Sequence, residues 1–221
     1  ALIKFMPNVL GVYLYGSYSR GESTRESDID LLVIVQEKDE KIKSLFEDID
    51  IRVLTLENLK KSIKDFPVPI RIMLQESIVF LNPLLLEDLK KEKFNLNGLK
   101  WHFKDIKGII RIIEEFIKLD GEGIDSSHVY SLIMRARILY MIECLLKNKE
   151  FRNDGVRKKI LYYGLDEKLF DNYYSIYQKI RDKEQVKEKI NKNEIENLIS
   201  IIKLYLEEIE DETKKKIKKR N

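Results

Sequence analysis

Residues 9–35 read VLGVYLYGSYSRGESTRESDIDLLVIV, and this stretch decides the fold. Residues 9–15 are apolar and rich in β-branched and aromatic side chains, so they predict a short strand that ends at Gly16. Residues 30–35 form a second apolar run, of the kind found in strands that are covered on both faces. The polar residues 19–26 between the two runs predict one or two helical turns. The stretch therefore predicts two strands joined through a Gly-Ser turn and a short helix.

The rest of the chain changes its pattern at Pro83. Before it, residues 48–54 alternate strictly and predict a third strand, a helix is expected from Leu56 and another over residues 69–75, and residues 77–81 predict a fourth strand. After it, apolar residues recur at helical spacing over residues 84–91, 99–119, 126–148, 156–163, 167–183 and 192–219. We therefore predict an α+β fold, with a small mixed-sheet domain over residues 1–82 followed by an all-α helical bundle over residues 83–221.

The overall charge argues against a general nucleic-acid-binding surface. The 221 residues include 41 basic and 38 acidic side chains, which leaves a net charge of only +3. The basic excess is local, because lysines and an arginine crowd residues 214–220. We expect this run to be the solvated end of a helix, with a phosphate-backbone contact as the alternative.

The single cysteine, Cys144, excludes a disulfide within the chain and favours a reducing, cytoplasmic environment. It lies in an apolar run, so we expect a buried small side chain and not a nucleophile. No signal peptide and no apolar stretch long enough to cross a bilayer is recognisable in the sequence, so we expect no membrane association.

Two carboxylates at the start of the second strand carry the predicted chemistry. Asp28 and Asp30 are two residues apart, so the period of a strand places both on one face, about 6–7 Å apart at the backbone. This separation suits two divalent cations that lie about 3.5–4 Å apart. The nearby Gly16-Ser17 turn offers backbone N–H groups and a hydroxyl to a bound phosphate.

A third carboxylate is expected on the alternating strand of residues 48–54. Asp48, Asp50 and Arg52 share one face, so periodicity alone does not choose between the two aspartates. We select Asp50 because it lies deeper in the strand, where it could ligate the second metal and accept a proton. Each feature alone has a simpler interpretation: a Gly-Ser turn, a strand-edge aspartate, or an ion pair with Arg52. Their order along the chain favours the catalytic interpretation.

The Gly-Ser pair, the Arg20-Gly21 pair and the Ser27-Asp28-Ile29-Asp30 segment together resemble a known superfamily. This superfamily is that of the nucleotidyltransferases that include DNA polymerase β, and the chain is most similar to their minimal members. Ser19 stands where those proteins commonly have alanine. The resemblance extends through residue 81, the first third of the chain. It implies that the nucleotide is bound by Gly16, Ser17, Arg20 and Ser27, and the metal by Asp28, Asp30 and Asp50.

The helical half is similar to the bundles called HEPN domains and to the second domain of aminoglycoside nucleotidyltransferases. The similarity lies in Arg135 and Arg137 on one helix and in residues 174–181, YSIYQKIR, on another. Nuclease HEPN domains place a histidine several residues after an arginine, and neither His102 nor His128 has this spacing. We therefore do not expect ribonuclease activity.

These features predict a metal-dependent nucleotidyltransferase that moves AMP from ATP to an acceptor hydroxyl. The resemblance implies two Mg²⁺ ions, with Mn²⁺ as an alternative, and the chain could act as a homodimer. A small molecule or a protein is expected as the acceptor in preference to RNA. Two other functions stay open: a nucleotide-binding, antitoxin-like interaction protein with little turnover, and a nucleic-acid terminal transferase that uses the lysine-rich end.

Overall fold

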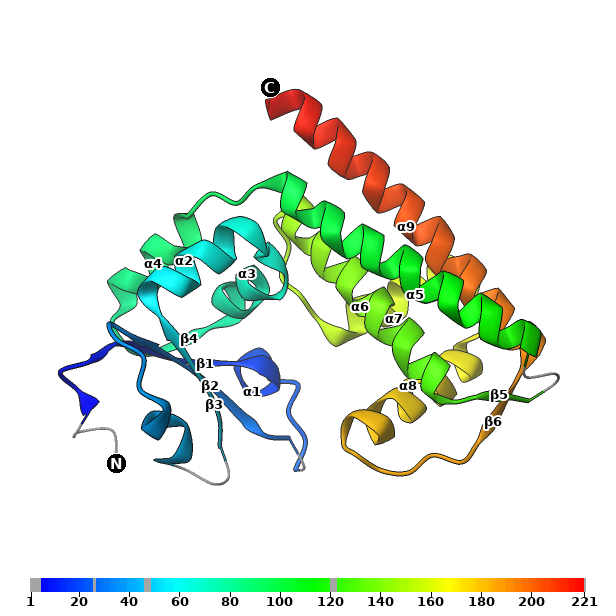
Figure 1. Cartoon of the computed structure of the whole chain (residues 1–221), viewed down its shortest axis with the longest axis horizontal. Coiled ribbons are helices and arrows are strands. Elements are labelled where there is room, and N and C mark those ends of the chain that lie inside the picture. Colours follow the sequence, from blue (N-terminus) through cyan, green and yellow to red (C-terminus); the bar gives the residue numbers. More distant parts are fainter. Residues whose placement is uncertain (1–4, 26, 46–48, 120–122, 221) are drawn as a thin grey trace. The chain divides into compact units, whose positions relative to one another are not determined.

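The computed structural model describes residues 5–25, 27–45, 49–119 and 123–220 of the chain (Figure 1). The chain divides into two compact units, Ala1–Gly98 and Leu99–Asn221. The first unit combines a mixed sheet with helices, and the second is built mainly of helices. The predicted α+β fold class is therefore confirmed.

The sheet of the first unit has the strand order β3-β2-β1-β4. Strand β1 is antiparallel to both β2 and β4, whereas β2 and β3 are parallel. All four strands were predicted from the sequence, and their described ends agree to within one residue. They are β1 (Val9–Tyr15), β2 (Ile29–Val35), β3 (Ile49–Thr55) and β4 (Ile78–Leu81).

Strand β2 is buried on both faces, as its continuous apolar run predicts. Leu32 and Ile34 pack into a core with residues of the helices α2, α3 and α4. Val33 and Val35 pack on the other face with Ile42, which belongs to a 3-10 turn. The helices and turns of this unit are α1 (Gly16–Arg20), the 3-10 turn Glu40–Leu45, α2 (Leu56–Asp65), α3 (Pro67–Glu76), α4 (Pro83–Lys91) and the 3-10 turn Leu96–Gly98.

Helix α4 belongs to the first unit, although the change of sequence pattern at Pro83 predicts a boundary before it. Asn82 connects α4 to β1: its side chain caps the helix at Leu85 and also donates a hydrogen bond to the Leu10 carbonyl. The Tyr13 hydroxyl of β1 donates to the Asn82 carbonyl. At the other end of α4, the Arg71 guanidinium of α3 donates to the carbonyls of two residues, Leu89 and Glu92. The compact unit therefore continues to Gly98.

The second unit is organised around helix α6, which contacts the other four helices of the unit. This helix is apolar around much of its circumference, as expected for a helix enclosed by others. The helices are α5 (Leu99–Leu119), α6 (Ser127–Lys147), α7 (Asn153–Tyr162), α8 (Glu167–Arg181) and α9 (Lys192–Arg220). All five correspond to predicted helical segments.

Two details differ from the sequence-based expectations. Strands β5 (Gly123–Asp125) and β6 (Lys189–Asn191) form an antiparallel pair in the helical unit. Three residues are too few for alternation to be recognised, so this pair was not predicted. Helix α1 begins at Gly16 and not at Ser19, which places the Gly-Ser pair in its first turn.

Cys144 is fully buried, as predicted for a small apolar side chain. Burial raises the pKa of its thiol to about 11, so the reactive thiolate is disfavoured. In the described part of the chain, no helix combines the length and the apolar character that crossing a membrane requires.

Candidate active site

Three of the predicted site residues, Gly16, Asp30 and Asp50, lie close together at the end of the sheet where β1 ends and where β2 and β3 begin (Figure 1). We call this end of the strands the site edge. Tyr15, the last residue of β1, pairs with Asp30 in the antiparallel register, and Gly16 follows it directly. Asp30 also pairs with Asp50 on the parallel strand β3. Asp30 and Asp50 therefore lie side by side on neighbouring strands. Asp28 precedes β2 and is exposed.

Gly16 redirects the chain from β1 into α1. Its φ of +79° is a left-handed conformation that glycine adopts at low cost. A Cβ at this position would lie 2.0 Å from Oδ2 of Asp30, so the Gly16 α-carbon packs directly against that carboxylate. The Gly16 N–H donates a hydrogen bond of 2.8 Å to Oε1 of Glu76, the last residue of α3. The turn is therefore in contact with two carboxylates.

Glu76 also binds Arg20, the arginine of the recognised motif. Nη1 of Arg20 lies 2.7 Å from Oε2 of Glu76, and its Nε lies 2.8 Å from Oε2 of Glu22. The Arg20 and Glu76 side chains are each only 11% exposed. Burial acts to lower the pKa of Arg20, but the two carboxylates outweigh it and the pKa is raised. Burial raises the pKa of Glu76, and its hydrogen bonds counteract this only in part.

Negative charge accumulates around Asp30. Burial makes the largest contribution to its raised pKa, followed by the carboxylates of Asp50, Asp28 and Glu76. Arg20 acts in the opposite direction, and the resulting pKa is about 6. A bound divalent cation would offset this repulsion, because an opposite charge within a few ångströms favours the ionised carboxylate.

The two serines of the motif differ in their surroundings. The Ser27 hydroxyl accepts a hydrogen bond of 2.9 Å from the Thr24 N–H, which holds the loop that leads to Asp28. Among the described residues, none forms a hydrogen bond with the Ser17 hydroxyl. The backbone carbonyl of Ser17 accepts a hydrogen bond from the Glu22 N–H. Ser17 thus has a hydroxyl available for a ligand, whereas Ser27 shapes the loop.

The donor set at the site edge suits a cation that substrate phosphates complete. Within the described ranges no three His, Cys, Asp or Glu side chains are arranged as a complete metal centre. Mg²⁺ is commonly held by only one or two carboxylates together with substrate phosphates, and the paired Asp30 and Asp50 match that requirement. Asp48 lies outside the described residues, so the choice of Asp50 over Asp48 stays a prediction.

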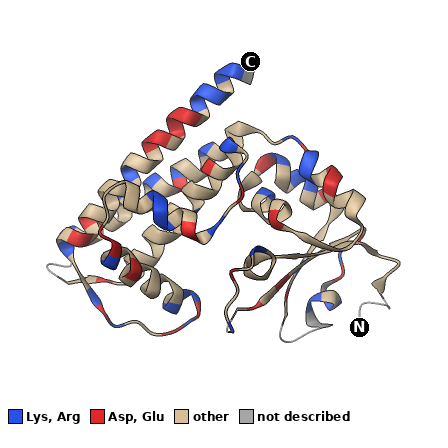
Figure 2. Ribbon diagram, turned by 180° about the vertical axis from the view of Figure 1, so that it is seen from behind, with Lys and Arg blue, Asp and Glu red and all other residues tan. Residues whose placement is uncertain are grey.

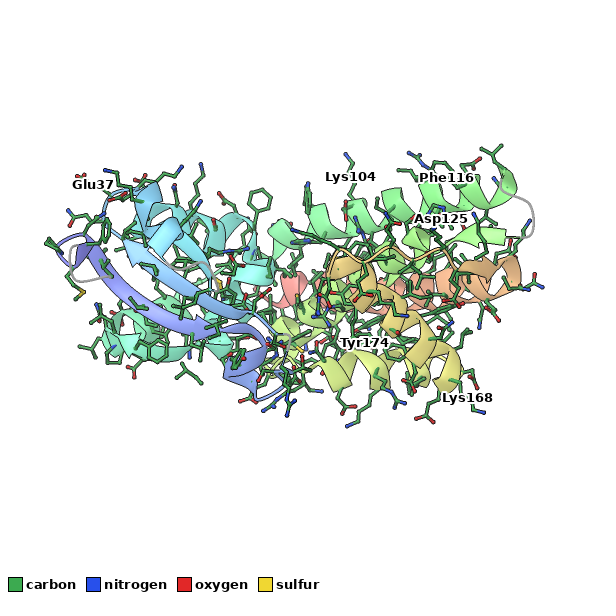
Figure 3. All side chains as sticks on the ribbon, turned by 90° about the horizontal axis from the view of Figure 1, so that it is seen from below. Glu37, Lys104, Phe116, Asp125, Lys168 and Tyr174 are labelled. Atoms are coloured by element: carbon green, nitrogen blue, oxygen red, sulfur yellow. The ribbon has the colours of Figure 1, made fainter. Side chains whose placement is uncertain are left out.

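In the helical unit, Arg137 of α6 is held among aromatic rings. Its Nη1 donates to Oδ1 of Asn153 at 2.6 Å and to the hydroxyl of Tyr174 at 3.2 Å. Its guanidinium lies 5.4 Å from the ring centroids of both Phe151 and Tyr177. Tyr174 of α8 is labelled in Figure 3. Arg137 therefore joins α6, α7 and α8.

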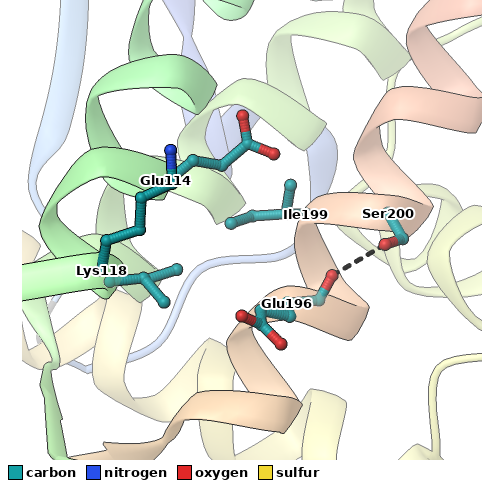
Figure 4. A pocket seen from close by; sticks show the side chains of 6 residues that line it. Glu114, Lys118, Glu196, Ile199 and Ser200 are labelled. Atoms are coloured by element: carbon teal, nitrogen blue, oxygen red, sulfur yellow. Dashed lines mark hydrogen bonds between the residues drawn. The ribbon is translucent and has the colours of Figure 1, made fainter. Parts of the chain in front are cut away.

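The pocket between α5 and α9 has a volume of about 360 Å³ and lies apart from the motif residues in sequence (Figure 4). Its lining combines apolar side chains with acidic and basic ones: Glu114, Ile117, Lys118, Glu196, Ile199 and Ser200. The lysine-rich residues 214–219 lie in the last turns of α9, where the ribbon is coloured for Lys and Arg near the end of the chain (Figure 2). His102 is buried beside the ring of Trp101, as expected for a packing residue.

Sequence reasoning missed Glu76. It follows an apolar segment that predicts a helix, and nothing in its spacing connects it to Gly16. One signal was available: it is an acidic residue at the C-terminal end of a helix, where the macrodipole disfavours negative charge. Such a residue needs a compensating partner, and here the partners come from the Gly16 turn and Arg20.

Comparisons with known proteins place this site in a family. The nucleotidyltransferase domain family matches residues 2–120, more than half of the chain. Among solved structures, a nucleotidyltransferase-like protein from Exiguobacterium sibiricum 255-15 is 15% identical, with a TM-score of 0.40, covering 91% of this chain and 70% of that one. Spectinomycin adenyltransferase AAD(9) from Enterococcus faecialis, solved with ATP and spectinomycin, is 14% identical, with a TM-score of 0.47 and 95% of each chain covered.

No curated protein matches the chain in sequence. The family match spans the whole of the site edge, from the Gly16 turn through the paired aspartates to Glu76. It is the extent of this match, and not the distant structural similarity, that decides the assignment. The chain belongs to the nucleotidyltransferase domain family and is a nucleotidyltransferase.

Proposed function

We propose that this enzyme moves AMP from ATP to a hydroxyl group of a small molecule or a protein. The observation that carries the proposal is the pairing of Asp30 with Asp50 on adjacent parallel strands, directly beside the Gly16 turn. Asp28 precedes the same strand, so three carboxylates lie near the place where a triphosphate would meet the turn. The raised pKa of Asp30 supports a site that is completed by positive charge.

In the proposed reaction Asp50 accepts the proton of the acceptor hydroxyl. The acceptor oxygen forms a bond to the α-phosphorus of ATP, and the bond from that phosphorus to the bridging oxygen breaks, so pyrophosphate leaves. Asp28, Asp30 and Asp50 would hold Mg²⁺, or Mn²⁺, which when bound neutralises the phosphates and polarises the reacting oxygens. The nucleotide would be held by Gly16, Ser17, Arg20 and Ser27, with Ser27 acting through the loop that carries Asp28.

The helical unit is proposed to select the acceptor. We also propose that this unit is a HEPN-like domain and that the enzyme acts as a homodimer. The nearly balanced charge of the chain, 41 basic against 38 acidic residues, supports an acceptor other than a nucleic acid. Lys214 pairs with Asp211 on α9, which further reduces the free positive charge near the end of the chain.

Transfer of labelled nucleotide is the direct test. The full-length protein would be incubated with Mg²⁺, ATP labelled on the α-phosphate and a cell extract, and the label would be traced in small molecules, proteins and RNA. We expect label on a small molecule or a protein, and none when Asp30→Asn replaces the unaltered enzyme. No transfer from any of the four triphosphates would contradict the proposal and favour the antitoxin-like binding protein.

Transfer to RNA is the outcome that would favour the third function. The matched control is a chain without residues 214–221. If label appears on RNA ends and disappears with these residues, the terminal-transferase interpretation replaces ours. Label on RNA that is unaffected by the deletion would also contradict the proposed acceptor, but it would show that the lysine-rich end takes no part in the transfer.

A further inference from the structure

We propose that Glu76 is a positioning residue, which holds the Gly16 turn in place for the nucleotide through one carboxylate oxygen and fixes Arg20 through the other. The two bonds are short and come from opposite sides of the same carboxylate: 2.8 Å from the Gly16 N–H to Oε1, and 2.7 Å from Arg20 Nη1 to Oε2. This inference rests on the proposed function, because it assigns a role to the turn that would bind the triphosphate.

The position of the Gly16 turn depends on contacts outside the sheet, because the strand pairing of β1 ends before Gly16. Strand β1 ends at Tyr15, and in the registers of its two neighbours no pairing extends to Gly16. The turn has a φ of +79° and packs against Oδ2 of Asp30, so a small displacement would change its relation to that carboxylate. Misplacement of a substrate by about 1 Å can cost about 10²-fold in rate. The hydrogen bond to Glu76 is the contact that fixes the turn from the side of α3.

The place of Glu76 in α3 does not serve the helix. A carboxylate in the last turn is disfavoured by the helix macrodipole, and this one is also largely buried, with 11% of its side chain exposed. Its anchor is rigid, because the neighbouring Met73 and Leu74 are buried in the core and Ser77 donates a buried hydrogen bond of 2.7 Å to the Met73 carbonyl. A buried carboxylate at this helix end is suited to hold the neighbouring Gly16 turn, since its own position is determined by packing.

Arg20 acts through this contact in our proposal. Its guanidinium pairs with both Glu76 and Glu22, so two carboxylates fix the orientation of the arginine side chain. Arg20 acts against the effect of burial on the pKa of Glu76, because an opposite charge favours the ionised carboxylate, and its bond to Oε2 orients the carboxylate. Arg20 thus supports the turn through Glu76, in addition to the nucleotide contact proposed above.

Two conservative substitutions separate this role from a purely electrostatic one. Glu76→Gln keeps the length of the side chain and an oxygen that can accept from the Gly16 N–H, but it removes the charge and places an amide nitrogen where Oε2 accepts from Arg20. Glu76→Asp keeps the charge but shortens the side chain by one methylene, so it cannot reach the Gly16 N–H from the same helix end. Glu22→Gln is the matched control, because it removes the charge of a second carboxylate that Arg20 contacts and leaves the Gly16 bond to Glu76 intact.

The readouts are KM for the Mg²⁺–ATP complex, kcat, and the Gly16 amide proton signal with its exchange rate in the ligand-free full-length protein. We expect Glu76→Asp to raise KM by about ten-fold and to speed exchange of the Gly16 amide, as the loss of a hydrogen bond to a charged group implies. Glu76→Gln should raise KM less than Glu76→Asp does and leave that amide protected, and Glu22→Gln should keep KM within about three-fold.

The opposite order, with Glu76→Asp close to the unaltered enzyme and Glu76→Gln impaired, would overturn the proposal in favour of a charge effect. Equal KM and an unchanged Gly16 signal in both variants would overturn it as well. A thermal melt of each variant shows whether loss of the fold accounts for a change. If the unaltered protein binds no triphosphate, the proposed function fails, whereas the Gly16 amide still reports whether Glu76 holds the turn.

Discussion

At the scale of single residues, the proposed active site depends on the space that Gly16 and Asp30 share. The absence of a side chain at Gly16 lets the Asp30 carboxylate lie against the backbone of the turn. The Asp30 carboxylate is also repelled by its acidic neighbours, since burial and three nearby carboxylates raise its pKa. Close packing and electrostatic repulsion therefore act on the same carboxylate.

The substitution Gly16→Ala should abolish nucleotide transfer. The added Cβ would lie 2.0 Å from Oδ2 of Asp30, and a non-glycine residue at a positive φ adds about 1 kcal/mol or more of strain. We expect loss of activity and a lower Tm, measured by label transfer and a thermal melt. Gly21→Ala is the control, because Gly21 also has a positive φ but its Cβ would meet no atom within 4 Å. Equal loss of activity in both variants would mean that backbone strain alone is responsible.

The substitution Asp30→Asn should abolish transfer without lowering the Tm. Removing the charge relieves repulsion from Asp50, Asp28 and Glu76 in the metal-free protein, so the Tm in a chelator should stay equal or rise by a few degrees. Asp30 is partly exposed to solvent, which keeps the gain small. Retention of full activity by this variant would exclude Asp30 as a metal ligand.

The substitutions Asp50→Asn and Asp48→Asn decide which acidic residue completes the site. Asp50 pairs with Asp30 in the sheet, and we expect its variant to lose about 10²–10⁴-fold in kcat while most of the affinity for triphosphate remains. The Asp48 variant should keep most of its turnover. Steady-state kinetics of both variants provide the measurement, and the reverse result would assign the role to Asp48.

At the scale of secondary-structure elements, a buried charge network joins three helices of the second unit. Glu143 of α6 accepts hydrogen bonds of 2.6 Å from the Tyr205 hydroxyl of α9 and 2.7 Å from Lys147 Nζ. Nζ of Lys159, on α7, lies 3.5 Å from Oε2 of Glu143. Burial acts to raise the pKa of Glu143, but the hydrogen bonds and the two lysines outweigh it, and the pKa is lowered. The ionised carboxylate therefore stabilises the packing of α6, α7 and α9.

The substitution Glu143→Gln should reduce the free energy of unfolding by about 1–2 kcal/mol at pH 7, because it removes the buried charge that Lys147 and Lys159 share, although each lysine keeps a second carboxylate, Glu212 or Glu208. A carboxyl whose pKa is lowered by folding stabilises the protein above its unfolded-state pKa of about 4.3, and this contribution is lost as the pH falls further. The difference between variant and unaltered protein in urea unfolding should thus shrink below about pH 4.3. Glu115→Gln, which removes an exposed pair with Lys118, should have little effect at either pH.

At the scale of the whole molecule, the two compact units correspond to a proposed division of labour. The first unit contains the Gly16 turn, the paired aspartates and Glu76, with a core on both faces of the sheet. The second unit has its own core, centred on α6. In our proposal the first unit binds nucleotide and metal, and the second selects the acceptor.

A truncated chain of residues 1–98 should bind Mg²⁺–ATP weakly and lose transfer to the acceptor. Truncation at residue 82 should unfold the first unit, because it removes α4, whose Leu86 and Leu89 are buried in the core of that unit. Circular dichroism and nucleotide binding of the two truncated chains would compare them. Acceptor transfer by residues 1–98 alone would contradict the division of labour.

Patterns along the chain were enough to predict the helices and strands and to single out the candidate site residues near Gly16. The strands at residues 9–15 and 29–35 and all five helices of the second unit follow from apolar periodicity, which depends only on neighbours along the chain. The Gly16-Ser17 pair and the Asp28 and Asp30 spacing were equally visible, because a turn and a strand face are local properties.

Only the tertiary structure decided which distant residues meet. The parallel pairing that sets Asp50 beside Asp30, the reach of Glu76 to Gly16 across 60 residues, and the attachment of α4 to β1 through Asn82 are contacts between elements. Periodicity tells which face of an element is buried, but it carries no information about the partner that covers it. That choice is made by packing of the whole core, and so the hold on the Gly16 turn became apparent only in the folded chain.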